Sequence, residues 1–219
     1  MLRALTTALL LILSCGFAQA QSPSPSATLA FTLDFPQSQP DHYSLRIDSA
    51  GRGEYESRTK LSAESDDEDS FKYEFTISPV TTQQMFALAA KAGYFRKDLD
   101  AHRKNMAFTG TKTLAYHDAE RSGESTYNFS ANTAVQQLTS LLQNLSATLE
   151  FGRRLDYDHR YQKTALEEEL KRLEETEHSN LVIELAAIAP VLKQIVSDSS
   201  VMNVSRARAQ RVLQKSGSD

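Results

Sequence analysis

The sequence contains few of the residues that carry the most recognisable protein chemistry. It has one cysteine and no tryptophan in 219 residues. The cysteine is Cys15, inside an apolar N-terminal segment, so a chain cleaved after Ala20 has no disulfide, no thiolate nucleophile and no cysteine-ligated metal. Without disulfides, the hydrophobic core must hold the fold together, and a mature chain of about 200 residues is long enough to build one.

Catalytic and phosphate-binding motifs are also missing. The 8 glycines form no phosphate-binding loop, and Gly51 and Gly53 are better explained as turn residues. There is no GxSxG nucleophile elbow and no HExxH zinc motif. The five histidines are scattered without a recognised metal spacing: His42, His102, His117, His159 and His178. The sequence therefore predicts no catalytic residue, no cofactor and no metal ligand.

Basic residues are in the minority. The formal net charge is −4, with 24 Lys and Arg against 28 Asp and Glu. Nucleic-acid-binding domains usually carry a strongly basic patch, so this balance argues against a nucleic-acid partner. A protein partner remains compatible with it.

The N-terminus has the layout of a secretory signal peptide. Arg3 supplies a basic start, residues 8–13 are apolar, and Ala18 and Ala20 are the small residues that a signal peptidase recognises. The apolar run is too short for a transmembrane helix, which needs about 20 residues, and no transmembrane segment is expected after signal removal. We expect a signal peptide over residues 1–20, a disordered Pro/Ser linker over 21–27, and a periplasmic or extracellular mature protein. A second interpretation makes Cys15 the lipid-modified residue of a bacterial lipoprotein, although Leu13 fits that motif poorly.

Alternating apolar residues predict an antiparallel sheet. Leu29, Phe31, Leu33 and Phe35 alternate with polar or small residues, and the same period-2 pattern recurs further along. Strands are expected over residues 29–35, 43–47, 54–59, 71–77, 110–116 and 124–130, with a hairpin turn at 49–53. One apolar face per strand indicates a sheet that is covered on one side only.

Two helices are expected to cover that face. Ser78 and Pro79 are a typical helix start and Gly93 a typical stop, while Asn132 caps a second helix with a leucine-rich stripe ending at Leu149. Residues 28–150 thus form a predicted sheet domain of four strands, a helix, two strands and a helix. The predicted fold class is α+β, an antiparallel sheet covered on one face by helices and followed by a helical C-terminal extension over residues 151–219.

The extension is amphipathic and highly charged. Leu166, Leu170 and Leu173 lie on one stripe among many charged residues, an arrangement typical of a coiled coil or helical hairpin. Pro190 must kink this run or begin a new helix. Two interpretations stay open for the segment: it packs on the sheet domain, or it binds a protein partner or a second copy.

Three polar clusters are candidate sites. The acidic run over residues 66–69 lacks the spacing of a calcium loop and is expected to be a solvated loop between strands. Asp98, Asp100 and His102 alternate and could converge on a metal or act in acid–base chemistry. The C-terminal cluster, Arg206, Arg208, Arg211 and Lys215, is expected to favour a helix C-terminus through its dipole rather than to bind lipid.

A resemblance covers roughly residues 41–130. Residues 77–79 (ISP) begin a helix after a strand, and residues 92–95 (AGYF) close it. This pattern resembles an uncharacterised family of exported bacterial α+β domains. The resemblance implies fold and export and carries over no activity.

The sequence therefore favours a non-enzymatic envelope protein that binds another protein through the helical extension or an exposed sheet edge. The alternative is a small periplasmic hydrolase or metal-dependent enzyme built on the sheet, with Asp98, Asp100 and His102 as its best candidates.

Overall fold

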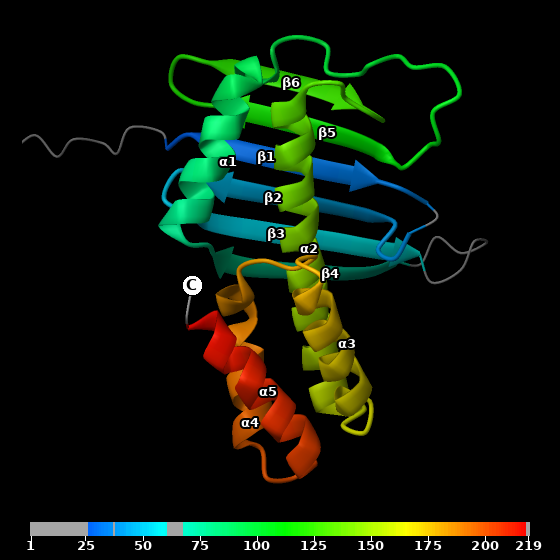
Figure 1. The fold of residues 1–219 in the computed structure, drawn as a ribbon, viewed down its shortest axis with the longest axis vertical. Helices are drawn as coiled ribbons and strands as arrows, with labels where there is room; N and C mark the ends of the chain where they lie inside the picture. The colour runs from blue at the N-terminus through cyan, green and yellow to red at the C-terminus, as the bar shows by residue number, and fades with distance from the viewer. Residues whose placement is uncertain (1–25, 37, 61–67, 218–219) are drawn as a thin grey trace, which may run out of the picture.

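The computed structural model describes residues 26–36, 38–60 and 68–217. The expected signal peptide, Cys15 and most of the expected linker lie outside the described residues. The described chain is an α+β fold, in which a six-stranded antiparallel sheet is followed by a C-terminal group of helices (Figure 1).

The sheet has the strand order β4-β3-β2-β1-β5-β6, and every neighbouring pair is antiparallel. Its strands are β1 (Thr28–Asp34), β2 (His42–Asp48), β3 (Arg52–Lys60), β4 (Glu68–Thr76), β5 (Thr111–His117) and β6 (Ser122–Tyr127). The period-2 pattern is confirmed because Leu29, Phe31 and Leu33 are all buried while Ala30 and Thr32 between them are not. The predicted hairpin between β2 and β3 is also confirmed, and Gly51 supplies its positive φ of 82°.

Two strands differ from the prediction. β4 begins at Glu68, so Glu68 and Asp69 belong to a strand and not to the expected loop, while residues 66–67 lie outside the described residues. Their pairing partners on β3, Lys60 and Thr59, extend the ladder this far. β6 ends at Tyr127 instead of residue 130. Beyond it the main chain bonds to another segment, with Asn128 N donating to Asp100 Oδ2 (2.7 Å) and Phe129 O accepting from Ala101 N (2.8 Å).

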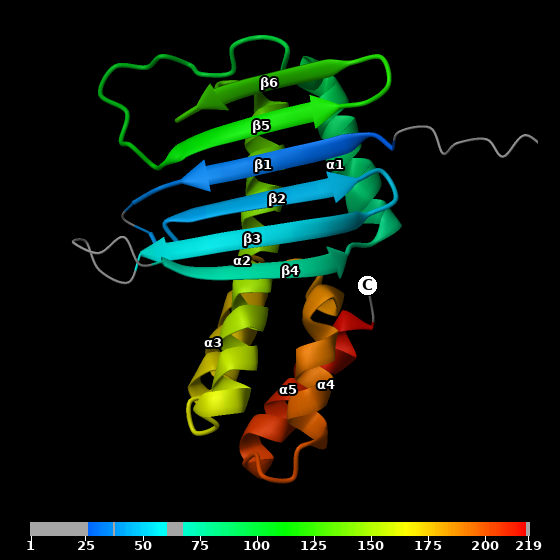
Figure 2. The same ribbon diagram turned by 180° about the vertical axis from the view of Figure 1, so that it is seen from behind.

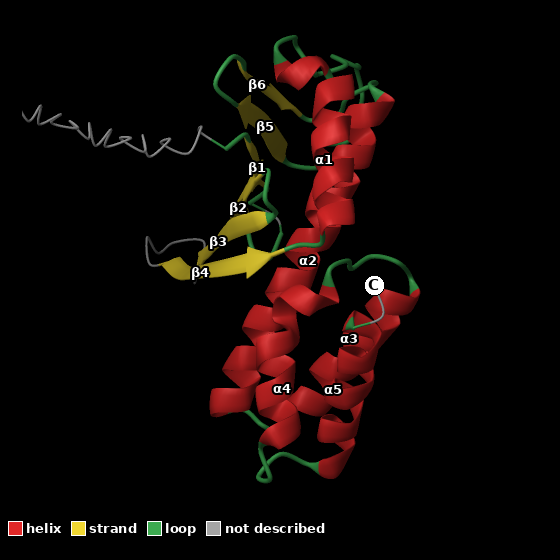
Figure 3. Ribbon diagram, turned by 90° about the vertical axis from the view of Figure 1, so that its left-hand side faces the viewer, coloured by secondary structure: helices red, strands yellow, loops and turns green. Residues whose placement is uncertain are grey.

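Helices cover one face of the sheet and leave the other bare, as predicted (Figures 2 and 3). Helix α1 (Pro79–Lys91) starts at an N-cap, Ser78, whose side chain accepts a bond from Thr81 N. A short 3-10 turn, η1 (Gly93–Phe95), follows at the predicted stop. Asn132 caps the second helix, α2 (Thr133–Tyr161), by accepting from Ala134 N and Val135 N. The buried faces of both helices join one core with the apolar face of the sheet.

Helix α2 extends well past the sheet and past residue 150, the expected end of the sheet domain (Figure 1). Where it leaves the sheet it is fixed to β3 by a buried carboxylate. Glu150 accepts hydrogen bonds from Tyr55 Oη (2.8 Å), Ser57 Oγ (2.7 Å) and Arg153 Nε (2.8 Å). These three donors compensate for the burial of a charge that is only 4% exposed.

The second half of α2 carries its own core together with the remaining helices. These are α3 (Leu166–His178), η2 (Leu185–Ile188), α4 (Ala189–Ser197) and α5 (Asn203–Ser216). The predicted leucine stripe, Leu166, Leu170 and Leu173, is fully buried in this second core. We call the second half of α2 with α3, η2, α4 and α5 the helical unit. It packs mainly on itself and contacts β4 through Ala187 with Tyr73 and Arg153 with Asp69. Pro190 lies in the first turn of α4 instead of kinking a longer helix.

Three of the four residues in the C-terminal basic cluster pair with α3. Arg208 contacts Glu167 (2.8 Å) and Glu174, Arg211 contacts Glu174 (2.9 Å), and Lys215 contacts Glu177. Ion pairs with a neighbouring helix therefore account for Arg208, Arg211 and Lys215. Lys215 also lies in the last turn of α5, where the helix dipole favours a basic residue. Among the described residues, none of the helices is both long and apolar enough to cross a membrane.

Because the sheet and the helical unit have separate cores, we expect that one can unfold without the other. Leu170→Asp places a charge in the second core, so we expect loss of the helical unit at a cost of several kcal/mol, on the order of 3–5. The sheet core should survive. In hydrogen exchange, amides of α3 and α5 should lose protection while those of β1 and β2 keep it. The control is Leu181→Asp, because that side chain is already 55% exposed. Simultaneous loss of protection throughout would show instead that both cores unfold as one unit.

Candidate functional site

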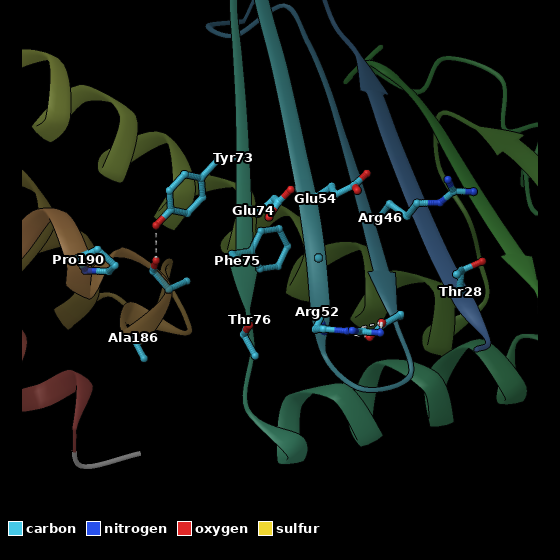
Figure 4. Close-up of a pocket in the computed structure, with 13 residues that line it drawn as sticks. Thr28, Arg46, Arg52, Glu54, Tyr73, Glu74, Phe75, Thr76, Ala186 and Pro190 are labelled. Carbon is cyan, nitrogen blue, oxygen red and sulfur yellow. Dashed lines mark hydrogen bonds and ion pairs between the residues drawn. The ribbon is translucent and has the colours of Figure 1, made fainter. Parts of the chain in front are cut away.

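A groove of about 690 Å³ runs between the β4 edge of the sheet and the start of α4 (Figure 4). Its sheet side comes from β1, β2, β3 and β4, and its other wall comes from the helical unit. The lining residues are Thr28, Arg46, Asp48, Arg52, Gly53, Glu54, residues 73–76, Ala186, Ala187 and Pro190.

β4 is an edge strand with outward-facing main-chain groups. Within the described sheet it pairs with β3 alone. In an antiparallel ladder, alternate residues direct both their N–H and their C=O to the neighbouring strand. The bond from Ile77 N to Gly51 O (2.9 Å) places odd-numbered residues on the β3 side. The main-chain groups of Lys72, Glu74 and Thr76 therefore point away from the sheet, towards the groove.

The opposite edge, β6, is covered by the chain that follows α1. A Cβ on Gly123 would lie 2.2 Å from Tyr94 O, so the two main chains are in close contact. Ser125 Oγ accepts a hydrogen bond from Leu99 N (3.0 Å). Phe129 O accepts another from Ala101 N (2.8 Å). In the part of the chain that is described, the outward main-chain groups of β4 face a groove, whereas β6 is contacted by the segment that follows α1.

Asp98, Asp100 and His102 meet in the segment that covers β6. His102 Nε2 lies 2.7 Å from Asp98 Oδ2, and Asp100 Oδ2 accepts a hydrogen bond from Asn128 N (2.7 Å) just after β6. The hydrogen bond with His102 is the main reason why the pKa of Asp98 is lowered, and the same bond raises the pKa of His102. The His102 side chain is 74% exposed. These contacts anchor the covering segment to the end of β6.

Among residues 26–36, 38–60 and 68–217, no three or more His, Cys, Asp or Glu side chains are placed to hold a metal ion. Two histidines form separate contacts with carboxylates, His42 with Asp34 (2.5 Å) and His159 with Asp198 (2.9 Å). Asp69 belongs to the acidic run over residues 66–69. It contacts Arg153 (3.4 Å) and takes part in the contact between β4 and α2.

Aromatic side chains of β4 form the floor of the groove. Tyr73 spans the gap, and its hydroxyl donates a hydrogen bond to Ala187 O (2.9 Å). Burial raises the pKa of Tyr73, which keeps the hydroxyl protonated as a donor. The Phe75 ring lies over Gly53, where a Cβ would come within 2.3 Å of the ring. Glycine at position 53 therefore leaves room for the phenylalanine that closes the core behind the groove.

The far wall is fixed to the sheet domain by Glu184. Its carboxylate accepts hydrogen bonds from Ser78 N (2.8 Å), Ser78 Oγ (2.7 Å) and Thr81 Oγ1 at the N-terminus of α1. A carboxylate is favourable at this position because the helix dipole is positive there. One residue earlier, Ile183 O accepts from Thr148 Oγ1 of α2 (2.7 Å). Glu184 holds a left-handed φ of 56°, which these contacts stabilise.

The uncovered face of the sheet beside the groove carries charged side chains in ion pairs. Asp48 binds Arg52 (2.8 Å) and Ala50 N (2.9 Å). Partial burial raises the pKa of Asp48. The hydrogen bonds from Arg52 and Ala50 outweigh this effect and lower the pKa overall. Lys72 contacts Glu56 (3.3 Å), its partner in the ladder.

A second hollow of about 310 Å³ continues along β4 on the other side of Tyr73. It shares Tyr73 and Pro190 with the first and is lined further by Phe71, Leu149, Gly152, Val191 and polar side chains of α2. The rings of Phe71 and Tyr73 stack, with centroids 6.0 Å apart. The two hollows together follow the edge strand from residue 71 to residue 76.

Sequence reasoning missed the groove because its walls are distant in the chain. Tyr73 and Ala187 are separated by 114 positions, and Ser78 and Glu184 by 106. One signal was available: Lys72 and Glu74 are charged residues of the kind that mark sheet edges.

No model of a known protein family matches this sequence, and no curated protein is similar to it.

The bond across the groove can be tested by Tyr73→Phe. Loss of the Tyr73–Ala187 hydrogen bond should lower the free energy of unfolding by about 1 kcal/mol in urea denaturation. The control is Tyr161→Phe, because Tyr161 is 70% exposed. Equal stability of the two variants would show that the bond does not help to hold the wall in place.

The covering segment should respond to pH through His102. Its folded pKa is above the usual 6.5, so its contact with Asp98 stabilises the segment below about pH 6.5 and is lost as the pH rises through the raised value. In NMR titration, Asp98→Asn should lower the pKa of His102, whereas Asp41→Asn should leave it unchanged. If the pKa of His102 is the same in Asp98→Asn as in the unchanged protein, the pairing is contradicted.

Proposed function

We propose that this protein is a non-enzymatic binding module of the bacterial envelope, which captures an extended segment of another protein at β4. The observation that carries this proposal is the asymmetry of the two sheet edges. The segment after α1 contacts β6 through Ser125, whereas the outward main-chain groups of Lys72, Glu74 and Thr76 face a groove.

Strand addition uses such an edge directly. A partner segment beside β4 would satisfy the free N–H and C=O groups with main-chain hydrogen bonds, and its alternate side chains would enter the groove. The floor offered to them is apolar and aromatic, with Tyr73, Ala187 and Pro190. The helical unit contributes the wall of this site, which gives the C-terminal extension a part in binding.

Export belongs to the same proposal. It is supported by the signal-like pattern of residues 1–20 and by the resemblance to exported bacterial domains over residues 41–130. Acylation at Cys15 would tether the same module to a membrane, whereas cleavage after Ala20 would release it.

Site-specific photocrosslinking in intact bacteria tests the binding edge. A photoreactive amino acid at Thr76, on β4, should yield a discrete adduct with another protein. The same amino acid at Glu124, an exposed position on the covered strand β6, should not.

The substitution Glu74→Pro, made in the chain that carries the photoreactive amino acid at Thr76, is the matched disruption of the binding edge. Proline at position 74 removes an outward N–H that a partner strand needs and leaves the ladder to β3 intact. The adduct should disappear while circular dichroism stays unchanged. An adduct that persists in a folded Glu74→Pro variant, or equal adducts at Thr76 and Glu124, would rule out strand addition at β4.

A further inference from the structure

Two like charges stand side by side at the open edge. Glu54 of β3 and Glu74 of β4 lie directly opposite each other in the ladder, on the uncovered face, and both are exposed. Among the described residues, no ion pair neutralises either carboxylate. Like charges in directly opposed positions destabilise a sheet. Glu54 has Arg46 of β2 as its ladder partner on the other side, whereas Glu74, at the edge of the sheet, has only Glu54 opposite it.

A strand added to β4 would place one side chain beside Glu74 and another, two residues away, beside Lys72 on the same face. Lys72 already contacts Glu56 at 3.3 Å. A basic side chain beside Glu74 would relieve the repulsion from Glu54, whereas an acidic one would add a third negative charge. The charge pattern therefore favours lysine or arginine at this one position of the added strand.

The intervening side chains of the added strand would point to the other face. There they would meet the aromatic ring of Tyr73 and the apolar residues Ala187 and Pro190. Burial of apolar side chains on this floor is favourable, and polar ones would lose water without gaining partners. The segment that fits thus alternates apolar residues with polar ones.

The shape of the molecule limits the occupant to a single strand. α2 continues beyond β4, and the rest of the helical unit lies beyond the same edge (Figures 1 and 3). A second copy that added its whole sheet would bring its own covering helices into this region. Residues 71–76 span about 20 Å, and the two hollows along them match one extended segment.

We propose that β4 recognises an extended segment of a partner protein in which apolar and polar side chains alternate and a lysine or arginine stands beside Glu74. This rests on the proposed function of strand capture and adds the sequence pattern of the partner.

Peptide selection tests the pattern. A display library of random seven-residue peptides is selected on the purified protein and, in parallel, on Glu74→Lys. Peptides from the unchanged protein should share one basic residue flanked on both sides by apolar ones, and peptides from Glu74→Lys should carry an acidic residue there. A synthetic peptide of the first kind should bind Glu74→Gln about fivefold more weakly. Glu124→Gln, at the covered edge, should bind it unchanged.

The outcomes separate the two proposals. Selected peptides with the same charge on both proteins would overturn the charge rule, and strand capture would still stand if Thr76 crosslinks specifically. No enrichment on either protein would overturn the recognition pattern. A dimer in sedimentation velocity that Glu74→Lys dissociates would identify a second copy as the occupant and would likewise overturn it.

Discussion

The carboxylate of Glu150 determines how the two parts of the molecule are joined. It sits on α2 where the helix leaves the sheet, and Tyr55 and Ser57 of β3 and Arg153 of its own helix all donate to it. Because a buried charge is tolerated only with such partners, the helix is fixed on β3 at this point. Together with the apolar stripe of α2 that packs on the sheet, this contact sets the direction in which α2 projects past β4. The helical unit is built on that projection.

The groove is a consequence of that projection. With α2 held across the sheet, the helices that follow must lie beyond β4, and the chain between α3 and α4 returns to the sheet domain. Glu184 and Ala187 in that returning chain contact α1 and Tyr73, which keeps the far wall at a fixed distance from the edge strand. The edge stays open because the wall touches it through side chains and not through a ladder of main-chain bonds.

Some of the site could be predicted from the sequence. The strand containing Phe71, Tyr73 and Phe75 is evident from its alternation, and Lys72 and Glu74 mark its exposed face. The partner of Tyr73 could not be predicted, because the contact joins positions 114 residues apart and no local pattern encodes it. Likewise, the alternation of Asp98, Asp100 and His102 indicated convergence, but only the position of Asn128 shows that these residues anchor a segment over β6.

The sequence by itself determined the local elements: the strands, the caps at Ser78 and Asn132, the turn at Gly51 and the α+β class. These depend on side-chain periodicity and on backbone preferences within a few residues. The tertiary structure alone decided which edge of the sheet is closed, where the helical unit lies, and that Glu54 and Glu74 face each other. Such features depend on strand order and register, which arise from contacts between segments far apart in the chain.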